Sequence, residues 1–352
     1  MTDRRRELDD LRRQMAQADA EMLRALQRRA RLAKQVGELG GGGSAVSERD
    51  QMGMLEGMAG EDLPAEMVRG VFREIHAATS SLERPSRVAY VAPEGGFGQV
   101  AALKQVGIGA TLIPVSSSEL AIDEVRRQRA DLAVIPFESS VEGPLQASVE
   151  ALAETDLSLG MKIEISASLS LVGKVGSTAA IEKIYAYAPD RLACRKYLDA
   201  LPGKLVEETE SPAAACRACL HDASGAALVP TATGEQFGVP VVEANVGDRA
   251  DLRVRYGLIS SRPSYRTGAD TTAILFGVHD EPGALFDVLK HFAERGVNLK
   301  TIQSRPRQGD NWNYLFYIEV SGHVTDRAVV TALEALKRQT RFLKVIGSFP
   351  SC

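Results

Sequence analysis

Apolar residues at heptad spacing characterise the first part of the chain. Between residues 8 and 39 the steps alternate between three and four, at Leu8, Leu11, Met15, Ala18, Met22, Ala25, Leu32, Val36 and Leu39. This pattern predicts one long amphipathic helix of roughly 45 to 50 Å. The remaining heptad position is Arg29. A guanidinium on a packing face costs several kcal/mol unless an anion pairs with it, so Arg29 is a candidate anion-binding residue.

A glycine-rich segment, GGGGS at 40–44, follows this helix. Its composition predicts a flexible turn and is also typical of an engineered linker. Two further helical stretches are expected, from about Ser47 and from about Pro64 to Leu82. Because three helices with one long member enclose little core, we expect the long helices of two chains to pack against each other.

From Arg87 onwards, short apolar runs alternate with helical stretches. The runs include VAYVA, TLIPV, DLAVIPF, KIYAY and AALVP, and the helical stretches include residues 118–129 and 212–221. This alternation predicts an open α/β sheet, whose ligands bind beyond the carboxyl ends of the strands. Two strand ends stand out, PEGGFG at 93–98 and ESSVEG at 138–143. The first lacks the spacing of nucleotide-binding loops, so no nucleotide is predicted.

The segment ESSVEG carries Glu138, Ser139, Ser140 and Glu142. We expect a helix to begin there, because hydroxyl groups cap helix starts and the free backbone N–H groups bind anions. Two interpretations are open: an anion site, or a serine that only caps the helix.

The stretch GDRADLRVRYGLIS at 247–260 raises a second question. It interleaves two sets of side chains, apolar Val254, Tyr256 and Leu258 with basic Arg249, Arg253 and Arg255. The apolar set predicts a strand with one buried face. The arginines are either solvated side chains on an exposed edge strand or the wall of an anion site.

The chain ends in six elements in the order strand, helix, strand, strand, helix, strand, from DTTAILFGV to FLKVIGSFP. Both helices are amphipathic, with apolar faces formed by Leu285, Val288, Leu289 and Phe292 and by Val329, Ala332, Leu333 and Leu336. This order predicts a ferredoxin-like α+β domain.

Composition narrows the class of protein. The 352 residues are 44% hydrophobic and 25% charged, typical of a soluble globular protein with two or three domains. A net charge of −4 gives no general attraction to nucleic acid. Because the sequence has no apolar run of about 18 residues and no apolar leader, we expect no membrane span and a cytoplasmic location. Cys216 and Cys219 form a CxxC whose spacing fits neither zinc nor haem, so buried thiols are expected, with no cofactor or metal.

The last domain resembles the ACT domains attached to prephenate dehydratases. PGAL at 282–285, NLKTIQSRP at 298–306 and NYLFYIEVSGH at 313–323 carry the resemblance, with Gln303 where that family has glutamate. The resemblance implies that L-phenylalanine binds across a domain interface at Gly283, Ala284, Leu285, Asn298, Gln303 and Ser304. A Gly-Ala turn lets the backbone approach an amino-acid head group. The alternative is an ACT fold without a ligand.

The middle of the chain resembles the catalytic domain of prephenate dehydratases, a two-lobed α/β unit like the periplasmic binding proteins. PEGGFG resembles that family's PEGTFS, ESSVEG its ENSxEG, and VGDRADLRVRYGLI its IxDxxxNxTRFxVI. The resemblance implies prephenate as substrate and a catalytic set of Glu138, Ser140, Glu142 and Arg255. This chain departs from the family at Gly96, Ser139, Leu252 and Val254. Val254 replaces a threonine that assists the departure of the ring hydroxyl, and valine has no hydroxyl to donate a proton.

The first segment resembles the all-helical chorismate mutases that precede this domain in bifunctional proteins. Arg12, Arg29, Arg49 and Asp50 match that family's substrate-binding arginines and its Arg-Glu pair. The resemblance implies chorismate, a dicarboxylate that arginines clamp while its ether bond breaks. Two expected donors to the ether oxygen are replaced, by Gly40 and Leu82. Losing one such donor costs about 10²–10³ in rate, so weak mutase activity is expected.

These resemblances imply three domains, at 1–84, 86–262 and 270–350. The main hypothesis is an enzyme that makes phenylpyruvate from chorismate through prephenate, with feedback by L-phenylalanine. Two alternatives follow from the replaced residues: a catalytically impaired phenylalanine-sensing regulator, and an enzyme that decarboxylates prephenate without dehydrating it. The long helix and the ACT domain both leave surfaces to bury, so a homodimer or tetramer is expected.

Overall fold

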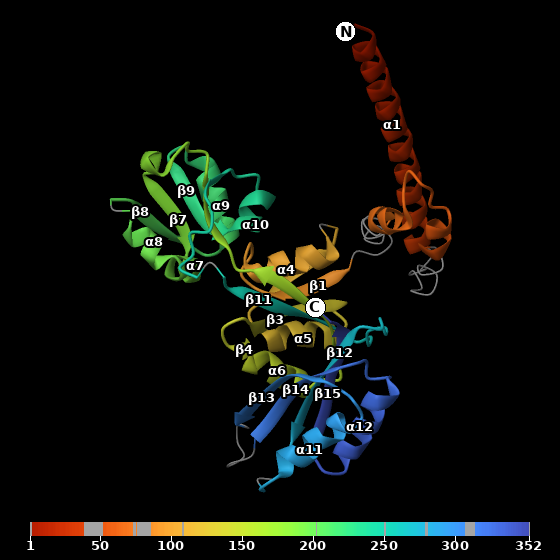
Figure 1. Ribbon diagram of the computed structural model, residues 1–352. Coiled ribbons are helices and arrows are strands. Elements are labelled where there is room, and N and C mark those ends of the chain that lie inside the picture. The colour runs from red at the N-terminus through yellow and green to blue at the C-terminus, as the bar shows by residue number, and fades with distance from the viewer. Residues whose placement is uncertain are drawn as a thin grey trace. The chain divides into compact units, whose positions relative to one another are not determined.

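The computed structural model describes residues 2–38, 52–72, 75, 86–107, 109–201, 203–249, 251–278, 281–306 and 314–351. The chain divides into two compact units (Figure 1). One comprises Met1–Ser86 with Val106–Thr111, and the other comprises Arg87–Gln105 with Leu112–Cys352.

The first unit is helical, as predicted. Helix α1 spans Thr2–Glu38, and residues 52–57 and 65–72 are also helical. The apolar heptad side chains described on α1 are exposed, among them Leu11, Met15 and Met22. The Nη1 atom of Arg29 is buried and has no hydrogen-bond partner among the residues that the structure describes. A solvated apolar face is typical of a helix that packs against a partner, and a buried guanidinium nitrogen is suited to binding an anion.

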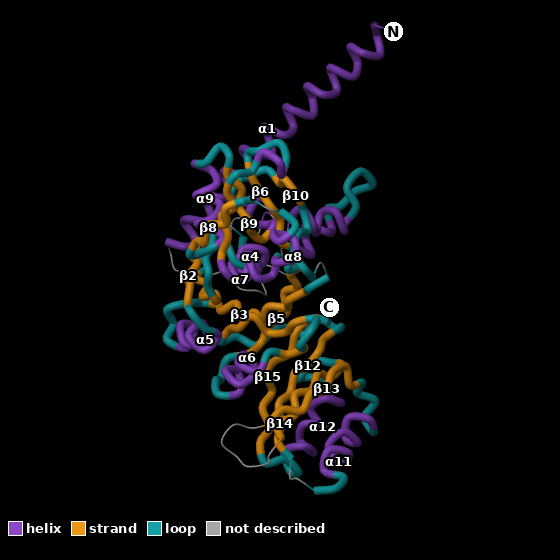
Figure 2. The backbone as a smooth tube through the Cα atoms, turned by 90° about the vertical axis from the view of Figure 1, so that its left-hand side faces the viewer, coloured by secondary structure: helices purple, strands orange, loops and turns teal. Residues whose placement is uncertain are grey.

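The second unit begins with two α/β lobes, each built on one sheet (Figure 2). The first lobe has strands in the order β2-β1-β3-β11-β5, with β4 paired to β3. Its elements are β1 (Arg87–Val91), α4 (Phe97–Val106), β2 (Thr111–Val115), α5 (Ser118–Arg126), β3 (Leu132–Ser139), β4 (Gly143–Pro144), α6 (Gln146–Ala153), β5 (Ser158–Ser166) and β11 (Arg253–Ser260). The chain leaves this lobe after β5 and returns to it with β11.

The second lobe has the strand order β10-β6-β9-β7-β8. Its elements are β6 (Leu169–Gly173), η1 (Thr178–Ala180), β7 (Lys183–Tyr187), α7 (Ala188–Ala193), α8 (Arg195–Asp199), β8 (Leu205–Thr209), α9 (Pro212–His221), β9 (Gly225–Pro230), α10 (Thr231–Gln236) and β10 (Val241–Glu243). The expected two-lobed α/β architecture is confirmed. Cys216 and Cys219 are buried free thiols on α9, and burial raises the pKa of Cys216 to about 12, which keeps it a protonated thiol.

The C-terminal domain is the predicted ferredoxin-like fold. Its elements are β12 (Asp270–Gly277), α11 (Ala284–Ala293), β13 (Leu299–Pro306), β14 (Tyr314–Ser321), α12 (Arg327–Lys337) and β15 (Phe342–Pro350). The strand order is β13-β14-β12-β15. One face of this sheet packs under α11 and α12, where Ile274 and Phe276 meet Val288 and Leu336.

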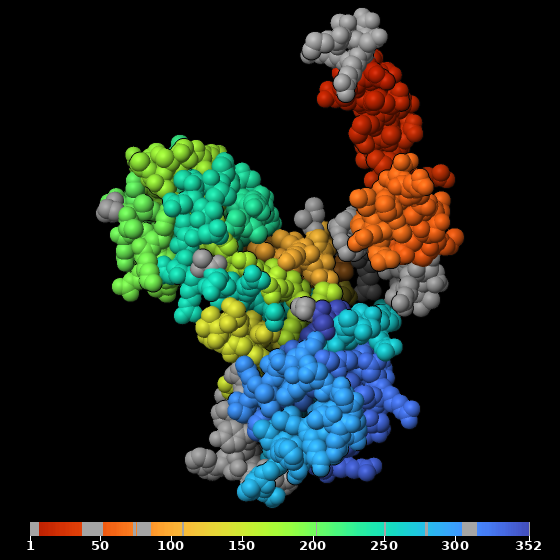
Figure 3. Space-filling view, in the orientation of Figure 1, coloured from red at the N-terminus to blue at the C-terminus, as the bar shows by residue number. Residues whose placement is uncertain are grey.

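The opposite face of this sheet packs directly on the first lobe. Leu275, Tyr317 and Phe349 belong to the same buried cluster as Phe137 and Leu159. In the space-filling view of Figure 3, the blue C-terminal domain lies against the yellow part of the first lobe. Every residue of β12 is therefore buried, because its two sides face two different apolar layers. The first lobe and the C-terminal domain share one hydrophobic core.

Candidate active site

Strand β11 lies in the interior of the first-lobe sheet, between β3 and β5. The edge-strand interpretation of its arginines is therefore wrong. The start of β11 pairs with the ends of β3 and β5. Val254 is in register with Ser139 and Ile165, and Arg255 is in register with Glu138 and Glu164. Because neighbouring residues on a strand point to opposite faces, Val254 and Arg255 leave the sheet on opposite sides.

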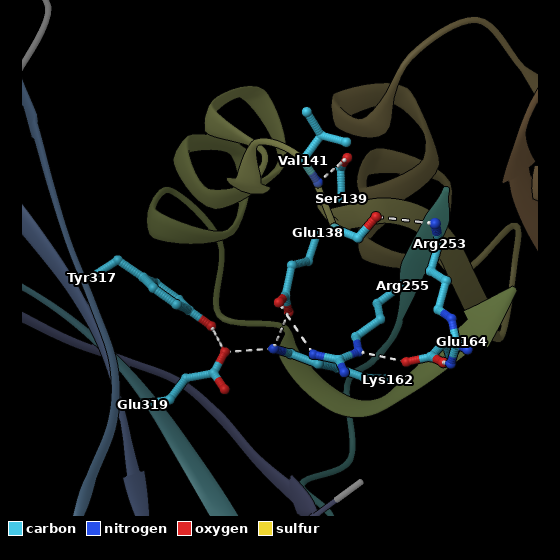
Figure 4. Close-up of polar contacts among 10 residues, drawn as sticks. Glu138, Ser139, Val141, Lys162, Glu164, Arg253, Arg255, Tyr317 and Glu319 are labelled. Carbon is cyan, nitrogen blue, oxygen red and sulfur yellow. Dashed lines mark hydrogen bonds and ion pairs between the residues drawn. The ribbon is translucent and has the colours of Figure 1, made fainter. Parts of the chain in front are cut away.

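Arg255 pairs with both flanking carboxylates (Figure 4). Its Nε lies 3.0 Å from Oε2 of Glu164, and its Nη1 lies 3.2 Å from Oε1 of Glu138. Arg253 Nη1 lies 2.7 Å from the other oxygen of Glu164. The two guanidinium groups, that of Arg253 first, hold the pKa of Glu164 below its usual value. Glu164 is therefore ionised at neutral pH. Arg253 and Arg255 belong to a charge-paired cluster, in which Arg253 is 65% exposed, and Arg249 is an exposed side chain.

The ESSVEG segment does not begin a helix. Gly143 and Pro144 pair back with Ser139 and Glu138 as strand β4, and α6 begins at Gln146, capped by Leu145 without a side-chain hydrogen bond. The positive φ of Gly143, 71°, permits this tight return. The expected helix start at the serines and the helix-capping interpretation are therefore wrong, and the anion site stays a prediction.

The two serines instead organise the turn and the neighbouring strand. Ser140 Oγ accepts a hydrogen bond from the Arg253 backbone N–H at 3.1 Å, and the Ser140 N–H donates to the Arg253 carbonyl at 2.9 Å. Ser139 Oγ accepts from the backbone N–H of Val141. Glu142 is exposed on the turn. Of the predicted catalytic set, the structure brings Glu138 and Arg255 into direct contact, while Ser140 fixes the start of β11.

The glycine-rich turn after β1 contacts the second lobe. The carbonyl of Glu94 accepts from the Ala213 N–H at 3.2 Å, and the carbonyl of Gly95 accepts from Thr233 Oγ1 at 2.6 Å. A Cβ on Gly95 would lie 2.6 Å from the Ala213 nitrogen, so only glycine fits here. The turn thus brings its neighbour Phe97 to the boundary between the lobes.

A cavity of about 260 Å³ lies at this boundary. Its lining includes Phe97 and Val100 of α4, Ser166 at the end of β5, Ser168 just after it, and Thr231 and Glu235 of α10. Sequence analysis missed its hydroxyl groups, because each is a single serine or threonine with no motif around it. The fold brings them together, because the chain segment that follows β5 packs against the start of α10 in the second lobe.

The hydroxyl groups in this region form a network. Ser168 Oγ donates to Asn245 Oδ1 at 2.6 Å and lies 3.2 Å from Thr231 Oγ1, which lies 2.7 Å from Ser170 Oγ. Ser166, on the cavity wall, is the register partner of Arg253. The cavity therefore combines an aromatic wall with hydroxyl groups, and the start of β11 adjoins it only through the strand pairing of Arg253 with Ser166.

The residues predicted to bind an effector lie at two places in the C-terminal domain. Gly283, with φ 90°, precedes α11, where Ala284 and Leu285 begin the helix and Leu285 packs among the helix-side apolar residues. Asn298 is exposed just before β13. Gln303 is in register with Tyr317, which faces the first lobe, whereas Ser304 is in register with Phe316 on the helix side. Within one chain Gln303 therefore faces away from the α11 turn.

Of the residues predicted to bind chorismate in the helical unit, the structure describes Arg12 and Arg29. Arg12 is exposed and makes a 3.8 Å contact with Asp9 one turn away. Arg49, Asp50, Gly40 and Leu82 lie outside the residues that the structure describes. Within the described part of the chain there is no cluster of three or more metal-ligating side chains. None of the helices described is both long and apolar enough to cross a bilayer.

Fold and site together define a class of protein. It has a helical unit, a two-lobed α/β domain with a cavity between its lobes, and a ferredoxin-like domain that shares a core with the first lobe. In the same order, the chain matches chorismate mutase type II over residues 11–84, prephenate dehydratase over 88–264 and the ACT domain over 272–338. The chain belongs to the family of bifunctional chorismate mutase/prephenate dehydratases with an ACT domain.

Relatives match along most or all of the chain. The bifunctional chorismate mutase/prephenate dehydratase of Aquifex aeolicus is 35% identical over 354 residues, covering 98% of each protein. That of Neisseria gonorrhoeae is 30% identical over 340 residues, covering 95% of this chain and 94% of the relative. The crystal structure of prephenate dehydratase in complex with L-Phe from Arthrobacter aurescens is 32% identical, with a TM-score of 0.62, and covers 75% of this chain and 90% of that one.

Proposed function

We propose that the two-lobed domain converts prephenate to phenylpyruvate in the cavity between its lobes. The observation that carries this proposal is the position of the cavity, which has Phe97 of the PEGGFG segment on one side and Ser166, beside the start of β11, on another. The N-terminal unit would supply prephenate from chorismate, and L-phenylalanine would act through the ACT domain. A cytoplasmic location stays a prediction from the sequence.

The reaction requires an anion anchor and a proton donor. When the ring carboxylate of prephenate leaves as carbon dioxide, its bonding electron pair enters the ring, and the ring hydroxyl leaves with one added proton as water. Arg255 is the proposed anchor for a carboxylate, because a guanidinium presents five N–H donors in one plane and its side chain is 37% exposed. It is not one of the described residues that line the cavity and it leaves the sheet on the side opposite Val254, so this role rests on its match to the family's motif. Thr231 is the proposed hydrogen-bond donor to the departing hydroxyl, in place of the hydroxyl that Val254 lacks, because the single hydroxyl hydrogen of Ser168 is donated to Asn245.

Incubation of the pure protein with prephenate tests the proposal, with products identified by mass. Phenylpyruvate has lost carbon dioxide and water, whereas the product of decarboxylation alone retains the water. Phenylpyruvate above the uncatalysed background supports dehydration. The heavier product would replace it with decarboxylation, and no product together with tight L-phenylalanine binding would favour the impaired regulator.

Replacing Val254 by threonine is expected to raise dehydratase turnover roughly tenfold or more. The two side chains have the same shape, and the new hydroxyl restores a donor of the kind that contributes about 10²–10³ elsewhere. Ile165→Thr is the control, because it adds a hydroxyl at the register partner of Val254 on the neighbouring strand, and it is expected to give no increase. An unchanged rate in Val254→Thr would show that other groups already protonate the hydroxyl.

We propose that α1 packs against α1 of a second chain. This pairing buries the exposed row that contains Leu11, Met15 and Met22. Sedimentation at micromolar concentration is expected to show a dimer or tetramer, and a Met15→Lys, Met22→Lys double variant is expected to sediment as a smaller species. A wild-type monomer would contradict the proposal.

A further inference from the structure

Lys162 is a buried cation between the first lobe and the ACT domain. Its side chain is 3% exposed. Its Nζ lies 2.7 Å from Glu138 Oε2 in the first lobe and forms an ion pair with Glu319 on β14 of the ACT sheet (Figure 4). Removing an ammonium group from water is costly unless it is paired, and here each domain provides one of the two carboxylates.

Aromatic rings enclose the same ammonium group. Its nitrogen lies 5.3 Å from the ring centroid of Phe137, in the first lobe, and 5.2 Å from that of Phe349, in the ACT domain. Tyr317 donates its hydroxyl hydrogen bond to Glu319, which fixes that carboxylate on the ACT side. The position of Lys162 is therefore determined by both domains at once.

The contacts of Lys162 continue to the arginine-bearing strand β11. Glu138 uses one carboxylate oxygen for Lys162 and the other for Arg255. An unbroken series of ion pairs thus runs through Glu319, Lys162, Glu138, Arg255, Glu164 and Arg253. Glu138 binds both Lys162 and Arg255. A shift of β14 that changes the ion pair between Glu319 and Lys162 would therefore also change the ion pair between Glu138 and Arg255.

A second contact joins the same two regions. A Cβ on Gly143, in the ESSVEG turn, would overlap the side-chain nitrogen of Gln303 on β13. Gln303 is in register with Tyr317, and Gly143 adjoins the register partner of Glu138. Strands β13 and β14 therefore contact the ESSVEG segment both through the Lys162 ion pairs and through direct packing.

We propose that Lys162 is a positioning residue that couples effector occupancy of the ACT domain to the affinity of the prephenate site, acting through Glu138 on Arg255. The inference rests on the proposed function for the identity of the two ligands. It does not require turnover, because coupling between two sites is a ratio of binding constants.

The test measures the KM for prephenate with and without saturating L-phenylalanine, or the calorimetric Kd where the protein shows no turnover. The wild type is expected to show a change of fivefold or more, in the usual range of allosteric coupling. Lys162→Met and Glu319→Gln are expected to reduce this change to less than twofold, while L-phenylalanine still binds. Glu319→Gln keeps the shape of the side chain. If Lys162→Met does not fold, Glu319→Gln alone tests whether the coupling depends on the ion pair with Lys162. Lys162→Arg is expected to restore part of the coupling.

Lys344→Met is the matched control. Lys344 also joins the two domains, from β15 to the carbonyl of Thr155 at 2.7 Å, but no described contact links it to Glu138. Its removal is expected to leave the coupling ratio unchanged. The inference would be overturned if the folded Glu319→Gln variant kept the full wild-type change in prephenate affinity, or if the wild type showed no coupling. A wild type that couples the two ligands without forming phenylpyruvate would sustain it and reject only the proposed reaction.

Discussion

Arg255→Gln is expected to lower kcat/KM for prephenate by about 10²–10³-fold, the usual cost of removing a charge-stabilising donor. The substitution removes the proposed anchor for a carboxylate and leaves Glu138 and Glu164 without the cation between them. Steady-state kinetics over a wide range of prephenate concentrations would measure the effect. Thermal unfolding of the same sample would show that the variant is folded.

Arg253→Gln is the control for this prediction. It removes the same charge two residues away on the same face of β11, but Arg253 is 65% exposed and its described ion pair involves one carboxylate, that of Glu164. We expect less than a tenfold loss in kcat/KM. Equal losses in both variants would mean that the cluster as a whole, and not Arg255, determines substrate binding.

Gly347→Ala is expected to lower the free energy of unfolding by about 3 kcal/mol or more, at the upper end of overpacking effects. A Cβ at this position on β15 would overlap the carbonyl oxygen of Leu159 and lie 2.8 Å from its backbone N and C atoms. Backbone atoms of β5 cannot rotate aside as a side chain can, so the ACT sheet has to move away from the first lobe.

Denaturant unfolding of Gly347→Ala beside Gly176→Ala would measure this effect. Gly176 has no atom within 4 Å of an added Cβ, so its replacement is expected to change stability by about 0.5 kcal/mol or less. Similar stabilities for the two variants would show that β15 and β5 can separate at little cost.

The sequence predicted those features that depend on local periodicity. The heptads of α1 and the six elements of the ACT domain were confirmed, because helices and strands impose their own spacing on apolar residues. The start of α6 was predicted too early, since nothing local shows that Gly143 turns the chain back onto β3. The interior position of β11 could not be predicted either, because its neighbours are some of the most distant segments of the domain in sequence.

The candidate site was predicted in part for the same reason. Glu138 and Arg255 were identified from motifs and are in contact, but the hydroxyl network of Ser168 and Thr231 arises only where the segment after β5 meets the start of α10 in the second lobe. Lys162 was overlooked because MKIEI alternates like a strand with one solvated face. In the folded chain the ACT sheet covers that face, so Lys162 is buried although the sequence pattern predicts an exposed lysine.

The shared core of the first lobe and the ACT domain limits how this chain can be divided. A truncation that ends after β11 would leave Phe137 and Leu159 uncovered, and an excised ACT domain would expose Leu275, Tyr317 and Phe349. Each fragment would carry a freshly opened apolar surface of the kind that drives aggregation. Effector sensing is thus built into the folding unit that carries Arg255, so losing the sensor by deletion would also cost the catalytic lobe its stability.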